Sequence, residues 1–415
     1  MKLKYKGQHI YKPYGVEKKN GRHRCLRCNN QKETLFYTYQ DAQGQCTYCL
    51  NCINLGRSDT LTPLYYEETI NYKDHLKHQL DFELNKEQCD ARDKIVRAIK
   101  EKRDLILYAV TGAGKTEITF QGIEYARNSG LRVAFVSPRV DVVREVFLRL
   151  KDAFVNARMD LLYRDEKIIT DYVFTVCTVH QLYNFVDHFD VIIVDEVDAF
   201  PLSGDKILEG QLRRAMTKVG TMILLTATPN RALLRGFKHS EIVTIKRRYH
   251  GHKLTLPKVI YEDTERYFKK KKLSKKLNIY LEQCIEQNRK ALVFVPEIRM
   301  LEPLMHVLKK KYIKIDSVYS GDPLRKQKVE QMRRDELDIL VTTTILERGV
   351  TFKYLDVFVV HAEYFNSASM IQIAGRTGRK SIDPIGNVYL FTKYNTLSLL
   401  KTKRAIRAFN KGGML

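Results

Sequence analysis

The stretch AVTGAGKTE, residues 109–117, carries residue types that bind the phosphates of a nucleotide. Backbone N–H groups near the glycines can surround phosphates, and a helix starting just after them adds the positive end of its dipole. Lys115 would neutralise the β- and γ-phosphates, and Thr116 would be a ligand of Mg²⁺. Ala109 stands where the full pattern has glycine, which is a small departure. The alternative is a glycine turn in front of a structural helix. The residues expected to contact the nucleotide here are Thr111, Gly112, Ala113, Gly114, Lys115 and Thr116.

A second candidate for the same chemistry is VIIVDEVDAF, residues 191–200, in which an apolar run ends in acidic residues. Carboxylates at the carboxyl edge of a parallel sheet can hold Mg²⁺ and a water molecule. Asp195 would hold Mg²⁺, and Glu196 would orient and deprotonate the attacking water. The alternative is a solvated loop with three acids. We take Glu196 as the catalytic base.

Two arginines lie three residues apart in QIAGRTGR, residues 372–379. Arg376 and Arg379 flank a glycine-bearing turn and could reach a γ-phosphate, where positive charge stabilises phosphoryl transfer. Basic turns are common, so this motif alone is weak evidence of a nucleotide site. It becomes strong evidence because it follows the phosphate loop and the acidic motif in this order. The predicted catalytic residues are therefore Lys115, Glu196, Arg376 and Arg379.

Five of the eight cysteines fall between positions 25 and 52. Cys25 and Cys28 form one C-x-x-C pair, and the second pair is either Cys46 with Cys49 or Cys49 with Cys52. Two such pairs supply the four thiolates of a tetrahedral zinc site, which leaves no open position for water and is therefore structural. The alternative is a set of unrelated reduced thiols.

The chain is strongly basic, with a formal net charge of +24, which indicates a polyanionic partner such as nucleic acid or an anionic membrane face. The alternative is a generally basic surface. Residues 1–60 carry 11 Lys and Arg against 4 Asp and Glu, and residues 246–276 carry 12 against 3. No apolar run approaches the roughly 18–20 residues that span a bilayer, and the start has no apolar signal segment. We therefore expect a protein kept in the cytosol, where thiols stay reduced.

The elements that must position these residues follow from the alternation of apolar runs and amphipathic stretches. The runs LILYAV, RVAFVSP, YVFTVCT, VIIVDE and MILLTATP predict one parallel sheet, and ALVFVP, IKIDSVYSG, DILVTT, DVFVV and GNVYLFT predict a second. The fold class is therefore α/β, with two units in tandem. We place a basic N-terminal region at 1–80, with a cysteine module at about 22–58, an α/β domain at 81–246, a basic linker at 247–276 and a second α/β domain at 277–415.

The order TGAGKT, DEVD, TAT and QIAGRTGR resembles motifs I, II, III and VI of the superfamily 2 helicases, over about residues 80–415. The resemblance implies two tandem RecA-like P-loop domains with parallel sheets and ATP between them. LNKEQ, residues 84–88, resembles the segment whose glutamine, here Gln88, reads adenine. VTTTILERGVTF, residues 341–352, resembles motif V and implies a nucleotide contact at Gly349, although Thr351 stands where aspartate is more usual.

The same resemblance implies contacts to a DNA backbone from SPR, from CTVHQL and from motif V. Contacts of this kind bind without sequence preference, and their affinity falls steeply with salt. The residues implied are Ser137, Pro138, Arg139, Thr178, His180, Thr342 and Thr343.

A four-cysteine module in front of a core with VTGAGKTE also resembles the ComFA family, the late-competence ATPases of naturally transformable Gram-positive bacteria. YCLNCINLGR, residues 48–57, matches that family's second cysteine pair and favours Cys49 and Cys52 over Cys46. The family implies a motor that draws transforming single-stranded DNA into the cytosol from the inner face of the membrane. It also implies ATP, Mg²⁺ and Zn²⁺ as cofactors, and ComFC, DprA and the membrane DNA channel as partners. The alternatives are a PriA-like replication-restart or repair helicase, and a DNA-binding scaffold with little motor activity.

Overall fold

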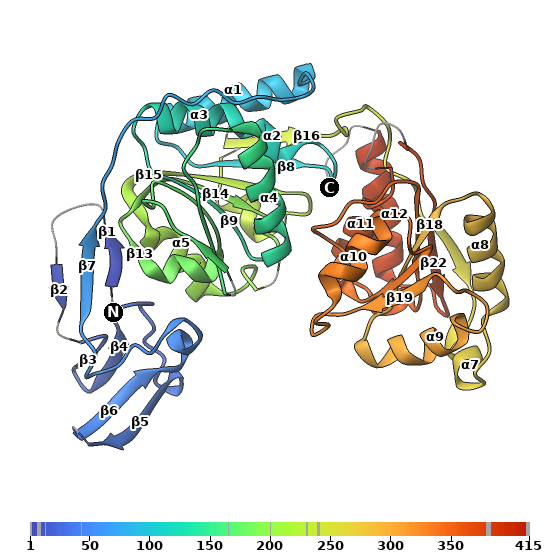
Figure 1. Ribbon diagram of the computed structural model, residues 1–415, viewed down its shortest axis with the longest axis horizontal. Coiled ribbons are helices and arrows are strands. Elements are labelled where there is room, and N and C mark those ends of the chain that lie inside the picture. Colours follow the sequence, from blue (N-terminus) through green and yellow to red (C-terminus); the bar gives the residue numbers. More distant parts are fainter. Residues whose placement is uncertain are drawn as a thin grey trace. The chain divides into compact units, whose positions relative to one another are not determined.

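The computed structural model of the chain describes residues 2–5, 10–12, 14–42, 44–164, 166–199, 201–229, 231–238, 241–378 and 383–411. The chain forms two compact units. The first comprises Met1–Tyr108 and Lys115–Thr244, and the second comprises Ala109–Gly114 and Ile245–Leu415. Each unit contains a largely parallel sheet with helices packed against it, as the sequence predicts (Figure 1).

The main sheet of the first unit has the strand order β11-β10-β12-β9-β14-β15-β8-β16. Neighbours from β10 to β8 are parallel, and β11 is antiparallel to β10. Every residue of β8, β9, β12 and β14 is buried, which is the pattern of a parallel sheet covered on both faces. The strands are β8 (Leu105–Ala109), β9 (Val133–Ser137), β10 (Asp160–Tyr163), β11 (Glu166–Ile168), β12 (Phe174–Thr178), β14 (Phe189–Asp195), β15 (Met216–Thr226) and β16 (Ile242–Ile245).

The helices of the first unit connect these strands and begin at recognisable caps. Asn85 caps the first helix in a capping box with Gln88, and the Asp205 carboxylate accepts the first N–H groups of the fifth. The helices are α1 (Lys86–Lys100), α2 (Lys115–Ile118), α3 (Phe120–Asn128), α4 (Val140–Ala153), α5 (Lys206–Ala215) and α6 (Arg231–Arg235).

The second unit has a sheet in the order β17-β22-β21-β18-β20-β19, with parallel pairing throughout. Its strands are β17 (Lys258–Tyr261), β18 (Lys290–Phe294), β19 (Ile315–Val318), β20 (Ile339–Thr342), β21 (Leu355–Val359) and β22 (Val388–Thr392). Its helices are α7 (Thr264–Lys269), α8 (Lys275–Glu286), α9 (Leu301–Leu308), α10 (Arg325–Arg333), α11 (Ser367–Ala374) and α12 (Leu397–Asn410). Side chains from β18, β20, α8 and α9 form a continuous buried core.

The basic stretch 247–276 is not the linker expected from the sequence. β17 pairs with β22 and is therefore the edge strand of the second sheet. An edge strand is open on one side, so it tolerates the exposed Lys258 and Tyr261 that hid its pattern. Arg248 is buried rather than presented to a partner, and it donates to the carbonyls of Thr377 and Gly378.

The N-terminal part, residues 2–68, is joined to the first unit by a small sheet in the order β13-β1-β7-β2. β1 runs parallel to both β7 and β13, so the start of the chain pairs with a segment 181 residues later. The strands of this small sheet are β1 (Lys2–Tyr5), β2 (Ile10–Lys12), β7 (Leu64–Glu68) and β13 (Phe185–Val186). The N-terminal part also contains the hairpins β3 (Val16–Lys19)–β4 (Arg22–Cys25) and β5 (Phe36–Asp41)–β6 (Gly44–Cys49).

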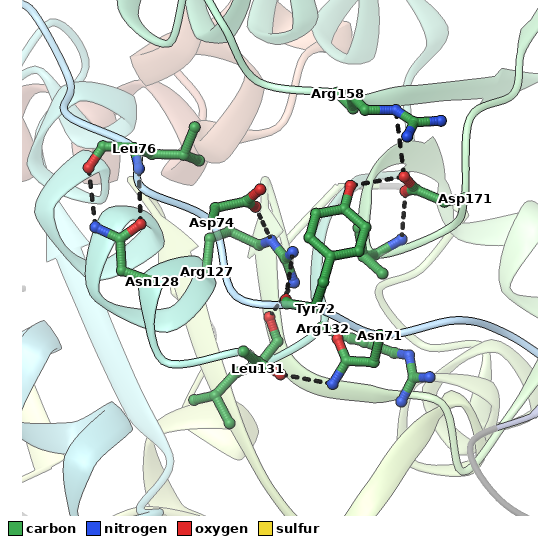
Figure 2. Close-up of polar contacts among 12 residues, drawn as sticks. Asn71, Tyr72, Asp74, Leu76, Arg127, Asn128, Leu131, Arg132, Arg158 and Asp171 are labelled. Atoms are coloured by element: carbon green, nitrogen blue, oxygen red, sulfur yellow. Dashed lines mark hydrogen bonds and ion pairs between the residues drawn. The ribbon is translucent and has the colours of Figure 1, made fainter.

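Residues 69–80, which we call the strap, run in extended form along the first unit and are tied down by side chains (Figure 2). Arg127, at the end of α3, donates from Nε to the Asp74 carboxylate at 2.7 Å. The Asn128 side-chain amide pairs with the backbone of Leu76, accepting its N–H at 2.7 Å and donating to its carbonyl at 2.9 Å. Several backbone groups of the strap are therefore hydrogen-bonded although it forms no strand.

Candidate nucleotide site, cysteine centre and DNA-contact residues

The predicted phosphate loop lies between the end of β8 and the start of α2, as its motif requires. Gly112 and Gly114 have φ values of +80° and +73°, which residues with a side chain rarely adopt. α2 begins at Lys115, and Thr119 between α2 and α3 keeps helical dihedral angles (φ −80°, ψ −14°). The loop and the helix after it have the local conformation that holds phosphates on backbone N–H groups.

The predicted acidic pair ends β14, at the carboxyl edge of the first sheet. Asp195 is buried and is the last residue of the strand. Glu196 has a φ of +57°, and its N–H donates to Asp195 Oδ1 at 2.9 Å. A left-handed non-glycine residue at this place is the kind of strained conformation found at functional sites. Glu196 Oε2 lies 4.0 Å from Nε of Arg139, at the start of α4.

A third acid, Asp198, joins the acidic loop to the TAT segment in the first unit. The hydroxyl of Thr226 donates to Asp198 Oδ1 at 2.8 Å, and that of Thr228 donates to Oδ2 at 2.6 Å. The sequence did not reveal that Asp198 accepts from both TAT hydroxyls. The third acid of the DEVD motif, Asp198, could have indicated this contact. Two hydroxyls separated by one residue suit the two oxygens of one carboxylate.

Gln88, predicted to read adenine, is 1% exposed and takes part in the cap of α1. Its side-chain oxygen accepts the N–H of Asn85 at 2.9 Å, while its own N–H donates to Asn85 Oδ1 at 3.0 Å. The helix cap thus fixes the orientation of the Gln88 side chain.

The second unit holds the predicted arginine motif and motif V. Arg376 is 2% exposed and donates from Nε to the Glu347 carbonyl at 2.8 Å and from a terminal nitrogen to the carbonyl of Val350. It therefore ties its own turn to the loop that contains Gly349, where φ is +75°. Arg379 lies outside the residues that the structure describes.

The phosphate-loop residues Ala109–Gly114 group with this same unit. A Cβ built on Gly375 would lie 2.0 Å from the Oγ1 of Thr111, so only glycine fits there. The structure thus brings one predicted nucleotide residue against the turn that carries the predicted arginines.

Most side chains predicted to contact DNA are buried, and their segments lie at the ends of strands. β9 ends at Ser137, β12 at Thr178 and β20 at Thr342, so each segment follows the carboxyl end of a parallel strand. His180 is exposed and Arg139 is partly exposed. The buried side chains are those of Ser137, Pro138, Thr178, Thr342 and Thr343. Any contact from these five would come chiefly from the backbone.

Four cysteines from two segments meet in the N-terminal part. The sulfurs of Cys25, Cys28, Cys49 and Cys52 all lie within 4.8 Å of one another, and all four residues are buried. This is the set that the ComFA resemblance implied; Cys46 is also buried but faces Tyr39 across the hairpin.

The distances among these sulfurs fit a tetrahedral metal site. Zn–S bonds of about 2.3 Å place the sulfurs of a tetrahedron about 3.8 Å apart. The Sγ atoms of Cys25 and Cys52 are 3.7 Å apart, and those of Cys28 and Cys49 are 3.6 Å apart. Hydrogen bonds from the other thiols lower the pKa of Cys25, whereas hydrogen bonding to Cys25 and burial raise the pKa of Cys52. Four buried thiolates need a cation, so the donor set fits Zn²⁺.

Arg27, between the first two cysteines, fixes this centre to the first α/β unit and was missed in the sequence. It is buried and donates to the carbonyls of Gly56 (2.8 Å) and Tyr183 (3.4 Å) and to Oδ1 of Asn184 (2.9 Å). Tyr183 and Asn184 end a short 3-10 helix that begins directly after Thr178. Arg27 thus connects the cysteine centre to the 3-10 helix that contains His180, one of the predicted DNA-contact residues.

Comparisons with known proteins cover most of the chain. Residues 1–66 match the family model for the competence protein ComFA N-terminal domain, 81–231 that for the type III restriction enzyme, res subunit, and 270–381 that for the helicase conserved C-terminal domain. The competence protein ComFA of Bacillus subtilis is 37% identical over 94% of this chain and 86% of its own length. That of Streptococcus pneumoniae is 35% identical over 95% of this chain and 92% of its own. The chain belongs to the ComFA family.

Solved structures show the same fold at low identity. Saccharomyces cerevisiae Dbp5 bound to RNA and ADP BeF3 gives a TM-score of 0.55 at 14% identity, covering 79% of this chain and 91% of Dbp5. Mycobacterium smegmatis helicase Lhr bound to ssDNA and AMP-PNP gives 0.59 at 18% identity, covering 79% of this chain and 50% of Lhr. The predicted fold of two RecA-like domains with parallel sheets is confirmed.

This family member is therefore a competence-associated, helicase-like ATPase. The helicase-type domains imply ATP and Mg²⁺ as cofactors. Among the residues that the structure describes, no helix has both the length and the apolar character needed to cross a bilayer.

Proposed function

We propose that this protein is a single-stranded-DNA-dependent ATPase that moves along the strand without reading its sequence and drives uptake of transforming DNA. The observation that carries the proposal is the set of ATPase residues at the carboxyl edge of the first sheet in a chain of the ComFA family. The placement of Glu196, with a φ of +57°, directly after the buried Asp195 supports a hydrolytic role for this acidic pair. The net charge of +24 suits a polyanionic substrate.

In this proposal the residues of the first unit divide the hydrolytic work. Lys115 binds the β- and γ-phosphates, and Thr116 with Asp195 holds Mg²⁺, which offsets phosphate charge when bound. Glu196 takes the proton of the attacking water. Arg139, 4.0 Å away, orients that carboxylate and lies in a predicted DNA segment. A DNA strand that contacts Arg139 would therefore change the position of the Glu196 carboxylate through this arginine.

The link from hydrolysis to movement would run through Asp198, Thr226 and Thr228. Both hydroxyls bond to one carboxylate, so a shift of the acidic loop moves the TAT segment with it. Arg376 and Arg379 would supply positive charge during phosphoryl transfer. Arg376 would do so by exchanging its bonds to the Glu347 and Val350 carbonyls for a phosphate.

We infer that the DNA contacts are made mainly by backbone N–H groups. Five of the seven predicted side chains are buried, and backbone groups at strand ends can bind phosphates of any sequence. Gln88 and Gly349 would contact the adenine and ribose end of ATP. The four cysteines would hold a structural Zn²⁺. The working domains would be residues 81–246 and a second domain of residues 277–415 together with the edge strand β17, with residues 1–80 as the zinc-bearing region.

The ComFA family further supports partners and a place for this motor. We propose that it acts at the inner face of the cell membrane beside the DNA channel, with ComFC and DprA as partners. Direct binding assays with each purified protein would test this part separately from the ATPase chemistry.

The test of the proposed function is ATP turnover with single-stranded, double-stranded and no DNA. We expect stimulation by single strands, and Lys115→Ala should reduce turnover at least about 100-fold, because the phosphates lose their charge partner. Lys151→Ala, an exposed lysine of α4, is the matched control and should turn over normally. Wild-type turnover in Lys115→Ala would overturn the mechanism.

Two outcomes would redirect the proposal. ATPase activity that ignores DNA would favour a scaffold of the uptake machinery. Displacement of a paired strand, measured with a fluorescent duplex carrying a single-stranded tail, would favour a PriA-like helicase over a motor that only pulls.

A further inference from the structure

One face of the β5–β6 hairpin carries three tyrosines, Tyr37, Tyr39 and Tyr48, which we call the tyrosine face. Tyr37 lies opposite Tyr48 in the strand register and Tyr39 lies opposite Cys46, so all three rings are on the same side. The ring centroids of Tyr37 and Tyr39 are 5.6 and 6.0 Å from that of Tyr48. In Figure 1 this hairpin forms the end of the N-terminal part farthest from the eight-stranded sheet.

Exposure on the tyrosine face is greatest at Tyr37, whereas Cys46 on the same face is buried, and the opposite face contributes Cys49 to the cysteine centre. Phe36 and Cys49 are paired on that opposite face, and Cys49 belongs to the four-cysteine group. Tyr37 is 55% exposed, and Tyr39 and Tyr48 are partly exposed. Adjacent aromatic rings left in water are costly, so such a patch indicates a binding surface.

An arginine is held against this face. The Arg57 guanidinium carbon lies 5.6 Å from the centroid of the Tyr39 ring, and NH1 donates to the Tyr39 hydroxyl at 2.5 Å. Nε donates at 2.7 Å to Asp59, a buried carboxylate that also accepts from the backbone of Leu61 and Thr62. Arg57 is thus fixed before any ligand arrives, with 46% of its side chain exposed.

The charge of the same N-terminal part suits a polyanion. Lys18, Lys19 and Arg22 are exposed on the β3–β4 hairpin, which contacts the β5–β6 hairpin through His23 and Phe36, on the face opposite the tyrosines. Glu17 is the one acidic residue of β3 and β4. Residues 1–60 together carry 11 Lys and Arg against 4 Asp and Glu. A ligand of this surface should therefore offer both flat apolar rings and negative charge.

We propose that the tyrosine face is a stacking platform for the bases of single-stranded DNA, with Arg57 contributing a cation beside the rings. The inference rests on the proposed function, which supplies a single-stranded substrate. Unpaired bases present π-faces of any sequence and carry phosphates, whereas the bases of a duplex are already stacked. The platform would hold the strand at a point separate from the hydrolytic residues.

The chain contains no tryptophan, so one substitution creates a unique reporter. The emission of Tyr37→Trp should be quenched on titration with an oligo-dT single strand, because a stacked base contacts the indole. An oligonucleotide of the same length with an abasic backbone should bind without the same quenching. Tyr261→Trp is the matched control, since Tyr261 on β17 is 54% exposed, and its emission should not change. Equal quenching at both positions, or by the abasic strand, would overturn the proposal.

Affinity separates stacking from charge. Tyr37→Ala should weaken oligo-dT binding about fivefold or more, and Tyr37→Phe, which keeps the ring, should restore it. The slope of log K against log salt should stay the same in Tyr37→Ala, because no phosphate contact is lost, and should fall in Lys18→Ala. Zinc content and DNA-free ATP turnover should match wild type in both tyrosine variants.

The outcomes distinguish this proposal from the proposed function. Unchanged affinity in Tyr37→Ala with normal DNA-stimulated turnover would reject the platform and leave the motor standing. Loss of binding to a purified protein partner, with DNA affinity intact, would assign the face to protein recognition and overturn the stacking proposal. Quenching of Tyr37→Trp in a protein whose ATPase ignores DNA would support the platform and reject the motor.

Discussion

The hydrolytic residues and the four cysteines lie in the same unit, but different forces hold them in place. Asp195 and Thr226 end neighbouring strands of a sheet whose central strands are buried, so hydrophobic burial fixes their positions. In the N-terminal part, the hydrophobic cluster among the described residues is built on Leu64 and Tyr66. So small a core needs an additional source of stability, such as a structural metal. The comparison teaches that the four cysteines stabilise the fold of the N-terminal part as well as forming a metal-binding site.

Removing one of the four zinc ligands should give the largest loss of stability. Cys52→Ser should lose bound zinc and make the N-terminal part sensitive to protease, because a structural zinc site contributes on the order of 10 kcal/mol to folding. Cys46→Ser is the matched control, since Cys46 is equally buried but outside the four-cysteine group. Zinc content per chain and limited proteolysis are the measurements. Retention of zinc by Cys52→Ser together with its loss from Cys46→Ser would reverse the ligand assignment.

Changing the predicted catalytic base should have the opposite effect: ATP hydrolysis is lost while the fold is retained. Glu196→Gln should lower DNA-stimulated ATP turnover by about 100-fold or more, because the amide cannot accept the proton of the attacking water. Nucleotide binding, zinc content and thermal stability should stay near wild type. Glu209→Gln, an exposed residue of α5, is the control and should hydrolyse ATP normally. Turnover in Glu196→Gln within a few-fold of wild type would move the base to another residue.

The same contrast explains what the sequence predicted. Most strands of both sheets and the phosphate loop were predictable, because continuous apolar runs and glycine spacing are local signals. The fold class followed from them. The strands β10, β11, β16 and β17 were missed. The cysteine set needed the family resemblance, since spacing left Cys46 and Cys52 equivalent until the hairpin register placed Cys46 opposite Tyr39.

What escaped prediction depends on contacts between distant segments. β13 has two residues and pairs with β1, so no local pattern reveals it. The strap has no periodicity because side chains of α3, not a strand, satisfy its backbone. The burial of Arg376 and the acceptor role of Asp198 are likewise set by tertiary contacts.

Arg27→Met should weaken the attachment of the cysteine centre to the part of the first unit that carries the hydrolytic residues. The change leaves the Tyr183 carbonyl and the Asn184 side chain without their donor in a buried place, so we expect a loss of about 2–4 kcal/mol in unfolding free energy. Zinc should still bind, because the four cysteines are intact. Arg24→Met, half-exposed on β4, is the matched control and should cost under about 1 kcal/mol. Urea unfolding with parallel zinc assays gives both values.

If Arg27 also positions the predicted DNA segment, its removal should lower DNA-stimulated activity as well as stability. DNA-stimulated turnover in Arg27→Met should then fall more than DNA-free turnover, measured at a temperature where the variant is fully folded. Equal loss of both rates would mean that Arg27 only holds the N-terminal part in place.

The smallest expected effect tests the strap, which joins the two regions along the chain. Asn128→Ala removes the amide that pairs with the backbone of Leu76, a buried strap residue, so we expect a loss of about 1–2 kcal/mol. Asn71→Ala removes one exposed bond to the Gly130 carbonyl and should change stability by less than about 0.5 kcal/mol. Hydrogen exchange at the Leu76 amide should accelerate in Asn128→Ala, because that N–H loses its acceptor. Unchanged protection there would mean that burial, rather than the paired amide, holds the strap, and that the N-terminal part relies on hydrophobic contact more than its small core indicates.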